Sequence, residues 1–226
     1  GEAFARRLVE VAMDRPAIRV LDADLEKPCR LDDFARRLPG RFLEMGICEQ
    51  DMVSCAGGLA LGGEIPVVNT YAAFFRRAFE QVYVNATEQT RILYAGHYAG
   101  LCYTTDGRTH QCTGDIAMMR SIPGMAVLYP ADPGELPGML DWFLDQWEGP
   151  AYIRLHRTPA PPCGGGPFRY GRGRQVRDFG APTAVITCGP HTTRYCREAV
   201  DALAADGGPH VDLWTVSTLK DLDREF

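Results

Sequence analysis

Apolar runs that are typical of buried β-strands alternate along the chain with stretches that have helical spacing. The strand-like runs lie at 17–25, 41–46, 66–73, 91–96, 125–132 and 151–157. The stretches between them lie at 49–62, 74–89, 112–121 and 134–147, and the second of these repeats apolar residues at helical spacing, namely Phe75, Phe79, Val82 and Ala86. This alternation predicts an α/β fold with a parallel sheet covered by helices on both faces.

The composition changes after residue 157. The segment 158–182 is dense in Pro and Gly, and we predict that it links a first domain at 1–157 to a second unit at 183–226. The second unit begins with a strand-like run, a helix and another strand-like run, so it resembles the start of a second α/β fold. It is too short to close a core of its own, so we expect either that it is incomplete or that it packs on something else.

Composition excludes several classes of protein. Of the 226 residues, 46% are hydrophobic and 23% charged, which is ordinary for a globular domain. The net charge of −5 gives no reason to expect nucleic acid or an anionic membrane as a partner, and no apolar run approaches the ~20 residues that a membrane span requires. The eight cysteines show no metal-binding spacing, and we interpret them as reduced thiols of a cytoplasmic protein.

Candidate functional side chains follow the predicted strands. Glu49 comes after the second strand, Tyr71 and Phe74 after the third, and His97 after the fourth, while Arg157 ends the sixth. In a parallel sheet the carboxyl ends of the strands meet at one edge, where ligands bind. The sequence therefore predicts a site at this edge.

Each of these residues also has an ordinary structural explanation. An acid such as Glu49 in the first turn of a helix complements the helix dipole. His97 and His110 can be hydrogen-bonded loop histidines, and aromatic side chains are more often part of a core than of a cofactor site. Their order along the chain argues against these explanations.

Two motifs carry a resemblance to a known family. The pieces "GICEQDM" (46–52) and "DGRTHQ" followed by "DIAMMRSIPGM" (106–125), with the elements around them in order over about 17–157, resemble the pyrimidine-binding domain of thiamine-diphosphate enzymes of the transketolase family. The tail after residue 183 looks like the start of the small C-terminal domain of that family. Deoxyxylulose-phosphate synthase and the β subunits of 2-oxoacid dehydrogenases share the same layout more loosely.

The resemblance implies a role for Glu49 and for nearby aromatic residues. Glu49 matches the glutamate that hydrogen-bonds N1′ of the cofactor's aminopyrimidine ring and so promotes loss of the thiazolium C2 proton. A carboxyl group partly removed from water shares a proton more readily with a weakly basic nitrogen. Tyr71, Phe74 and Phe75 are the candidates for stacking on this ring.

The resemblance also implies substrate-binding residues. His97 and His110 match two histidines that line the substrate channel and bind the ketose, and Asp106 matches an aspartate that contacts a sugar hydroxyl. Arg157 matches the arginine that binds the sugar phosphate, as suits a guanidinium group. Here Arg157 follows His156, where the common pattern has a small residue.

One part of the family's site is missing from the chain. The diphosphate and Mg²⁺ of thiamine diphosphate are bound in this family by a G-D-G motif followed by an Asn, and the sequence has no such motif. We therefore expect a partner subunit that carries this diphosphate-binding domain, in an α2β2 assembly, and no metal ligands on this chain.

The resemblance implies a two-component transketolase, which moves a two-carbon ketol unit from a ketose, often a phosphate, to an aldehyde. A deoxyxylulose-phosphate synthase usually has an acid where His97 stands. Two alternatives stay open. The acceptor can be a lipoyl or acyl-carrier-protein thiol, for which the unusual Tyr71, Cys102 and His156 leave room, or the chain can be a non-catalytic regulatory subunit, which the presence of Glu49 argues against.

Overall fold

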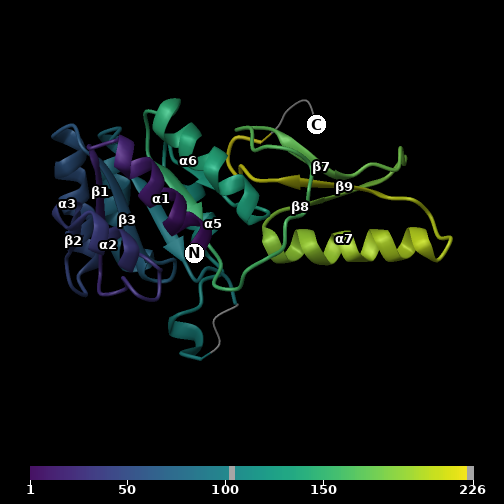
Figure 1. Ribbon diagram of the computed structural model, residues 1–226, viewed down its shortest axis with the longest axis horizontal. Coiled ribbons are helices and arrows are strands. Elements are labelled where there is room, and N and C mark those ends of the chain that lie inside the picture. Colours follow the sequence, from purple (N-terminus) through teal and green to yellow (C-terminus); the bar gives the residue numbers. More distant parts are fainter. Residues whose placement is uncertain (102–104, 223–226) are drawn as a thin grey trace.

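The computed structural model describes residues 1–101 and 105–222, and it contains a larger and a smaller sheet (Figure 1). The larger sheet has six strands in the order β2-β1-β3-β4-β6-β5, and all of its pairings are parallel. The strands are β1 Ile18–Asp22, β2 Phe42–Glu44, β3 Ile65–Tyr71, β4 Leu93–His97, β5 Ala126–Leu128 and β6 Ala151–Arg154. The predicted α/β fold with a parallel sheet is confirmed.

Helices cover both faces of this sheet. One face packs on α1 (Glu2–Asp14), α2 (Asp32–Arg37) and α6 (Leu136–Asp145), and the other on α3 (Glu49–Leu61), α4 (Phe79–Thr87) and α5 (Asp115–Arg120). Short 3-10 helices are η1 (Pro39–Arg41), η2 (Phe74–Ala78), η3 (Gly107–Thr109) and η4 (Pro133–Glu135). Since successive side chains of a strand point to opposite faces, Val67 and Val68 of β3 enter different cores.

Some elements differ from the sequence prediction. The helices α1 and α2 were not predicted, and the predicted helix at 74–89 is divided into η2 and α4. At this division the Arg76 side chain donates a hydrogen bond from Nε to the Ala73 carbonyl oxygen (2.8 Å). In a continuous α-helix the same oxygen would accept from the backbone N–H of Arg77. Local side-chain hydrogen bonding of this kind competes with regular helix.

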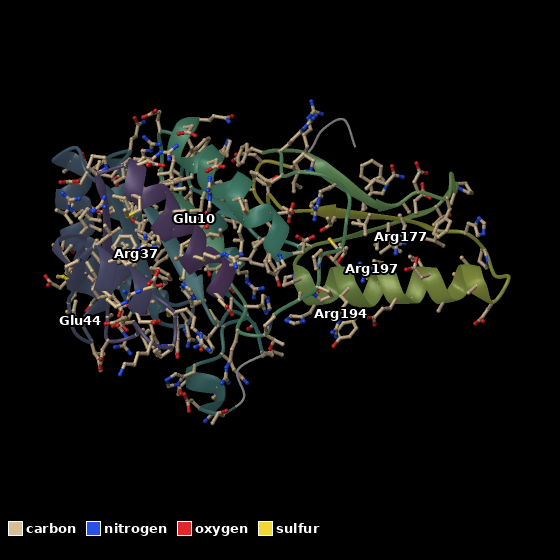
Figure 2. The ribbon with its side chains drawn as sticks, viewed as in Figure 1. Glu10, Arg37, Glu44, Arg177, Arg194 and Arg197 are labelled. Carbon is tan, nitrogen blue, oxygen red and sulfur yellow. The ribbon has the colours of Figure 1, made fainter. Side chains whose placement is uncertain are left out.

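The smaller sheet has the order β7-β9-β8 and packs on one long helix, α7 (Pro190–Ala205). Its strands are β7 Gly173–Arg177, β8 Ala184–Thr187 and β9 Asp212–Val216; β8 is parallel and β7 antiparallel to β9. The strand β7 lies within 158–182, where the sequence predicts only a linker, because its residues lack a regular apolar alternation. Arg177 of β7 donates to Asp201 of α7 at 2.6 and 2.7 Å and ties sheet to helix (Figure 2).

The segment after β9 joins the two sheets. The Tyr129 N–H donates to the Ser217 carbonyl (2.9 Å), and the Leu219 N–H donates to the Val127 carbonyl (2.8 Å). These bonds pair residues 217–219 with the β5 edge of the larger sheet, in antiparallel orientation at Leu128 and Thr218. The second unit therefore packs on the first.

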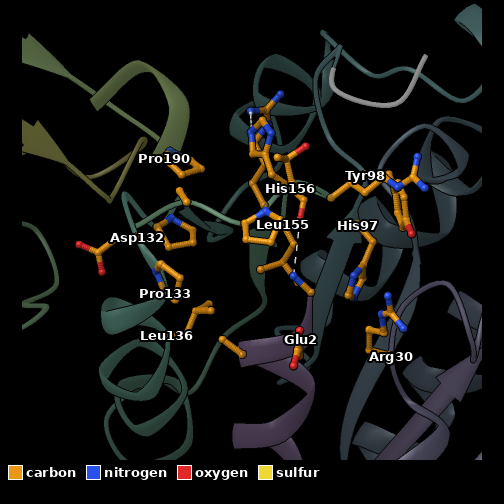
Figure 3. Close-up of a pocket in the computed structure, with 18 of the residues that line it drawn as sticks. Glu2, Arg30, His97, Tyr98, Asp132, Pro133, Leu136, Leu155, His156 and Pro190 are labelled. Atoms are coloured by element: carbon orange, nitrogen blue, oxygen red, sulfur yellow. Dashed lines mark hydrogen bonds between the residues drawn. The ribbon is translucent and has the colours of Figure 1, made fainter. Parts of the chain in front are cut away.

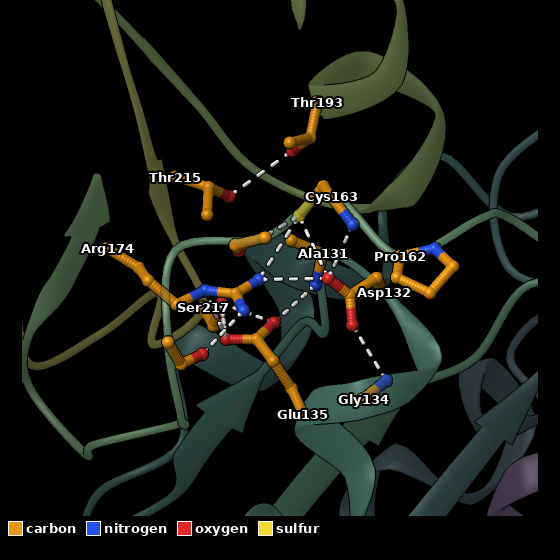
Figure 4. A network of polar contacts seen from close by, with 12 residues as sticks. Ala131, Asp132, Gly134, Glu135, Pro162, Cys163, Arg174, Thr193, Thr215 and Ser217 are labelled. Carbon is orange, nitrogen blue, oxygen red and sulfur yellow. Dashed lines mark hydrogen bonds and ion pairs between the residues drawn. The ribbon is translucent and has the colours of Figure 1, made fainter. Parts of the chain in front are cut away.

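A buried ionic network reinforces this junction (Figure 4). Arg174 of β7 donates to Asp132 Oδ2 (3.2 Å), and its Nε lies 3.4 Å from Glu135 Oε1. Cys163 donates to Asp132 from its backbone N–H (3.0 Å) and its thiol (2.9 Å), and the Ser217 hydroxyl donates to Glu135 (2.8 Å). Burial would raise the pKa of Asp132, but the hydrogen bonds from Cys163 and the charge of Arg174 outweigh it and lower that pKa. The Arg174 guanidinium of the second unit thus balances the charge of two buried carboxylates of the first unit.

Within the described ranges, no helix is both long enough and apolar enough to span a membrane.

Replacing Arg174 tests how much this network contributes to the stability of the fold. Arg174→Met leaves Asp132 and Glu135 buried without their countercharge, so we expect the free energy of unfolding to fall by about 3–5 kcal/mol. Arg177→Met breaks a pair whose Arg177 and Asp201 side chains are 33% and 42% exposed, and should cost less than about 1 kcal/mol. Urea unfolding at pH 7 measures both, and equal losses would contradict the assignment.

Candidate functional site

An aromatic cluster forms where β3 ends and η2 begins. The rings of Tyr71 and Phe74 stack with their centroids 5.4 Å apart and an interplanar angle of 23°. His110 meets both rings edge-on, at 6.0 and 5.2 Å, and Tyr98 lies 4.4 Å from Tyr71. Phe75 points into the core instead, where it packs edge-on against two other aromatic rings. The structure thus brings together two of the three candidate stacking residues.

The Glu49 carboxylate is buried in the first turn of α3. The side chain is 1% exposed, and its Oε2 accepts a hydrogen bond from Arg77 Nη1 at 3.2 Å. The Arg77 guanidinium also lies over the Phe74 ring, with Cζ 5.6 Å from the centroid, so it connects the carboxylate to the aromatic cluster. The positive end of the α3 dipole favours a carboxylate at this position. A buried acid therefore lies beside the stacked rings.

Small residues place Glu49 at the edge of the sheet. Gly46, with a φ of +74°, makes the turn between β2 and α3. A Cβ atom on Gly57 would lie 2.2 Å from Asn85 Oδ1, so any larger residue here would displace the Asn85 side chain from α3. Asn85 secures the contact by donating from Nδ2 to the Val53 carbonyl (2.8 Å).

His97 ends β4 beside Tyr71, its partner in the β3–β4 register. It is 1% exposed, its ring lies edge-on to Phe4 (5.8 Å), and its Nε2 has no hydrogen-bond partner among the described residues. Burial lowers the pKa of His97 well below its usual value, so the ring is neutral at pH 7. A buried, unpaired ring nitrogen is a hydrogen-bonding group available to a ligand.

His110 and Asp106 lie together on the loop after β4. His110 Nε2 lies 4.0 Å from Asp106 Oδ2, and its Nδ1 lies 2.9 Å from the Thr109 hydroxyl. The His110 and Asp106 side chains are 30% and 42% exposed, so both reach solvent. Among the residues with described positions, no group of three or more His, Cys, Asp or Glu side chains is arranged to hold a metal ion.

A cavity of about 360 Å³ opens next to His97 (Figure 3). Figure 3 shows Arg30, His97 and Tyr98 on one side of it, and Asp132, Pro133 and Leu136 on the other. Arg157 also lines the cavity, and its Cζ lies 5.6 Å from the Tyr98 ring centroid. Among the predicted site residues, His97 and Arg157 line this cavity, whereas Glu49, Asp106 and His110 lie outside its lining.

A buried polar network that reaches the cavity wall was not predicted. Arg154 donates to Asp115 from Nε (2.7 Å) and Nη2 (3.3 Å), and the Tyr152 hydroxyl donates to the same carboxylate (2.8 Å). His156 Nε2 lies 2.6 Å from the Tyr129 hydroxyl and 3.2 Å from Arg154 Nη1. Burial, followed by the charge of Arg154, lowers the pKa of His156 to about 3. His156 is therefore a neutral part of the cavity wall.

Sequence reasoning also missed Arg30 and Tyr98. Both residues follow predicted strands, so the rule that selected His97 and Arg157 would have included them had every residue after a strand been considered. Cys102, noted in the sequence as unusual, lies outside the described residues.

Comparisons with known proteins agree on one family. Residues 1–162 match the family described as "Transketolase, pyrimidine binding domain". The chain is 35% identical to the 1-deoxy-D-xylulose-5-phosphate synthase of Chlorobium luteolum (strain DSM 273 / BCRC 81028 / 2530), over 98% of this chain and 35% of that protein. It is 33% identical to the 6-deoxy-6-sulfo-D-fructose transketolase subunit SqwH of Clostridium sp. (strain MSTE9), over 82% of this chain and 59% of that protein.

Solved structures give the same result. A structure described as "Split gene transketolase, inactive beta4 tetramer" superposes with a TM-score of 0.85 at 35% identity, covering 99% of this chain and 73% of that one. Transketolase from Leishmania mexicana has a TM-score of 0.85 at 24% identity, over 97% of this chain and 34% of that one, and this likeness shows the fold alone. The chain thus spans about a third of the length of the synthase and most of the length of the split-gene chain.

The buried His156 predicts a specific dependence of stability on pH. The ring stays neutral in the fold but gains a proton near pH 6.5 in the unfolded chain. Above pH 6.5 both states are neutral and His156 does not change the free energy of unfolding. As the pH falls from 6.5 toward 3, protonation favours the unfolded chain and the free energy of unfolding decreases. Between pH 6.5 and 5 this loss amounts to about 2 kcal/mol. We expect His156→Asn to remove this share of the pH dependence, as measured by urea unfolding of both proteins at pH 7 and 5. Parallel stability–pH curves would contradict the assignment.

Proposed function

Because this chain belongs to the transketolase pyrimidine-binding domain family, we propose that it forms half of a thiamine-diphosphate-dependent active site. The reaction is the transfer of a two-carbon ketol unit from a ketose phosphate to an aldehyde. The observation that carries the proposal is the buried Glu49 carboxylate, which Arg77 connects to the stacked Tyr71 and Phe74 rings. His97 pairs with Tyr71 in the sheet register, and His110 meets the Tyr71 ring edge-on.

The residues at this edge fit the aminopyrimidine half of the cofactor. A ring with polar nitrogens needs a flat apolar surface and a hydrogen-bonding carboxyl, and Phe74 and Glu49 supply them from neighbouring segments. Thiamine diphosphate, when bound, supplies the carbon nucleophile that carries the two-carbon unit. Glu49 would hold a proton at the ring nitrogen, and Arg77 would have to yield its place on Oε2 or share it.

The histidines suit a polyhydroxylated substrate. His97 is neutral and presents an unpaired Nε2, so it can bind a carbonyl or hydroxyl group without adding charge. His110 and Asp106 offer further hydrogen bonds from the more exposed side of the cluster. Arg157, on the cavity wall, would bind the phosphate of the donor.

The diphosphate and Mg²⁺ would be bound by a partner subunit. The relative described as a split-gene transketolase supports this division, and this chain covers 73% of its length. The helix α3, which carries Glu49, presents the exposed Ile47 before its start and Leu61 at its end, at 72% and 70% exposure. We infer an α2β2 assembly in which the cofactor lies between the two kinds of chain.

Glu49→Gln is the first test of this function. The amide keeps the shape of the side chain but cannot exchange a proton with the ring nitrogen, so we expect turnover to fall by about 10²–10⁴-fold while the unfolding transition stays unchanged. Glu80→Gln, in the exposed first turn of α4, is the matched control and should keep normal turnover. The assay follows the ketose product by mass spectrometry in the presence of the partner. Normal turnover by Glu49→Gln would contradict the proposal.

The second test concerns the partner. This chain alone, with thiamine diphosphate and Mg²⁺, should not turn over a ketose phosphate, and addition of a polypeptide that carries the G-D-G motif should restore ketol transfer to an aldehyde. Turnover by the isolated chain would refute the divided site. If the pair acylates a lipoyl or carrier-protein thiol and leaves aldehydes unchanged, the proposed acceptor is wrong.

A further inference from the structure

Tyr98 adopts a backbone conformation that is rare for an aromatic residue. Its φ of +54° lies in the left-handed region, which a bulky side chain occupies only at an energetic cost. Arg30, on the loop after β1, has a φ of +66°. Both residues line the cavity next to His97 (Figure 3). Such strain persists where several surrounding contacts fix the residue.

Three segments hold the Tyr98 side chain. Its hydroxyl donates to the Pro28 carbonyl at 3.1 Å, which ties it to the loop that carries Arg30. Its ring lies 4.4 Å from Tyr71 at the end of β3, and the Arg157 guanidinium lies over it at 5.6 Å. Tyr98 thus connects the aromatic cluster with the Arg157 guanidinium and with the loop that carries Arg30.

We propose that Tyr98 is a positioning residue that holds Arg157 and Arg30 as a two-sided site for the anionic end of the donor. The proposal rests on the proposed function and adds a specificity element to it. Two guanidinium groups on one cavity match the oxygens of a phosphate ester, and a fixed guanidinium loses less entropy on binding than a mobile one. The aromatic face keeps Arg157 in place by cation–π attraction, and the hydrogen bond to Pro28 fixes the loop of Arg30.

The test replaces the ring but keeps the backbone. Asn tolerates the left-handed region, so Tyr98→Asn should fold normally, and we expect it to bind inorganic phosphate about tenfold more weakly than the unmodified chain. Tyr98→Phe keeps the ring and loses only the Pro28 bond, so its loss should be smaller. Tyr195→Asn is the matched control, because Arg194 lies over that ring at 4.4 Å outside the cavity. Isothermal titration of the full chain and of the assembled enzyme measures these affinities.

Kinetics separate positioning from a structural role. In the assembled enzyme, Tyr98→Asn should raise KM for a ketose phosphate about tenfold more than it raises KM for the unphosphorylated ketose, because only the phosphorylated donor uses the two guanidinium groups. An equal loss of kcat/KM for both donors would show a merely structural role and overturn the proposal.

The binding data distinguish this proposal from the proposed function. If the unmodified enzyme binds phosphate, and Arg157→Met loses this binding while Tyr98→Asn keeps it, the positioning role is wrong while ketol transfer stands. Absence of phosphate binding by the unmodified assembled enzyme also overturns it. If phosphate affinity follows the expected order but no ketol transfer occurs, the proposed function fails and the anion site stands.

Discussion

Burial of one carboxylate, that of Glu49, at the start of α3 is the constraint on which the site depends. A carboxylate out of water is costly unless the surrounding structure stabilises it, and here the helix dipole and Arg77 do so. The glycine at position 57 leaves room for the Asn85 side chain, which donates to the Val53 carbonyl and ties α4 to α3. The aromatic cluster, the neutral His97 and the cavity then occupy the adjoining strand ends, where parallel strands bring them together.

Directional contacts join the two units of the chain at the β5 edge of the larger sheet. Residues 217–219 extend the larger sheet at β5, and Arg174 links carboxylates of the first unit to the strand β7 of the second. Because Asp132 belongs both to this network and to the cavity wall, the junction also fixes one side of the cavity. Stability of the junction and shape of the cavity are therefore physically coupled.

Much of the fold and part of the site followed from the sequence, and the reason differs from residue to residue. The parallel sheet and the family, assigned from the motifs at 46–52 and 106–125, are confirmed, because alternation and spacing are local properties. The strand-end rule correctly brought Tyr71 and His97 side by side. The same rule could not tell which of Phe74 and Phe75 belongs to the aromatic cluster, because the 3-10 helix η2 determines which ring enters the core. The φ of Tyr98 and the pairing of Arg174 depend on distant segments and leave no local signal.

The most direct measurement is a structure of the assembled enzyme with thiamine diphosphate bound. The account predicts that the Glu49 carboxylate lies within hydrogen-bond distance of the aminopyrimidine N1′, with Phe74 against the ring and the diphosphate held by the partner chain. A cofactor bound by one chain alone, or a Glu49 that remains paired with Arg77 and makes no contact with the cofactor, would contradict it.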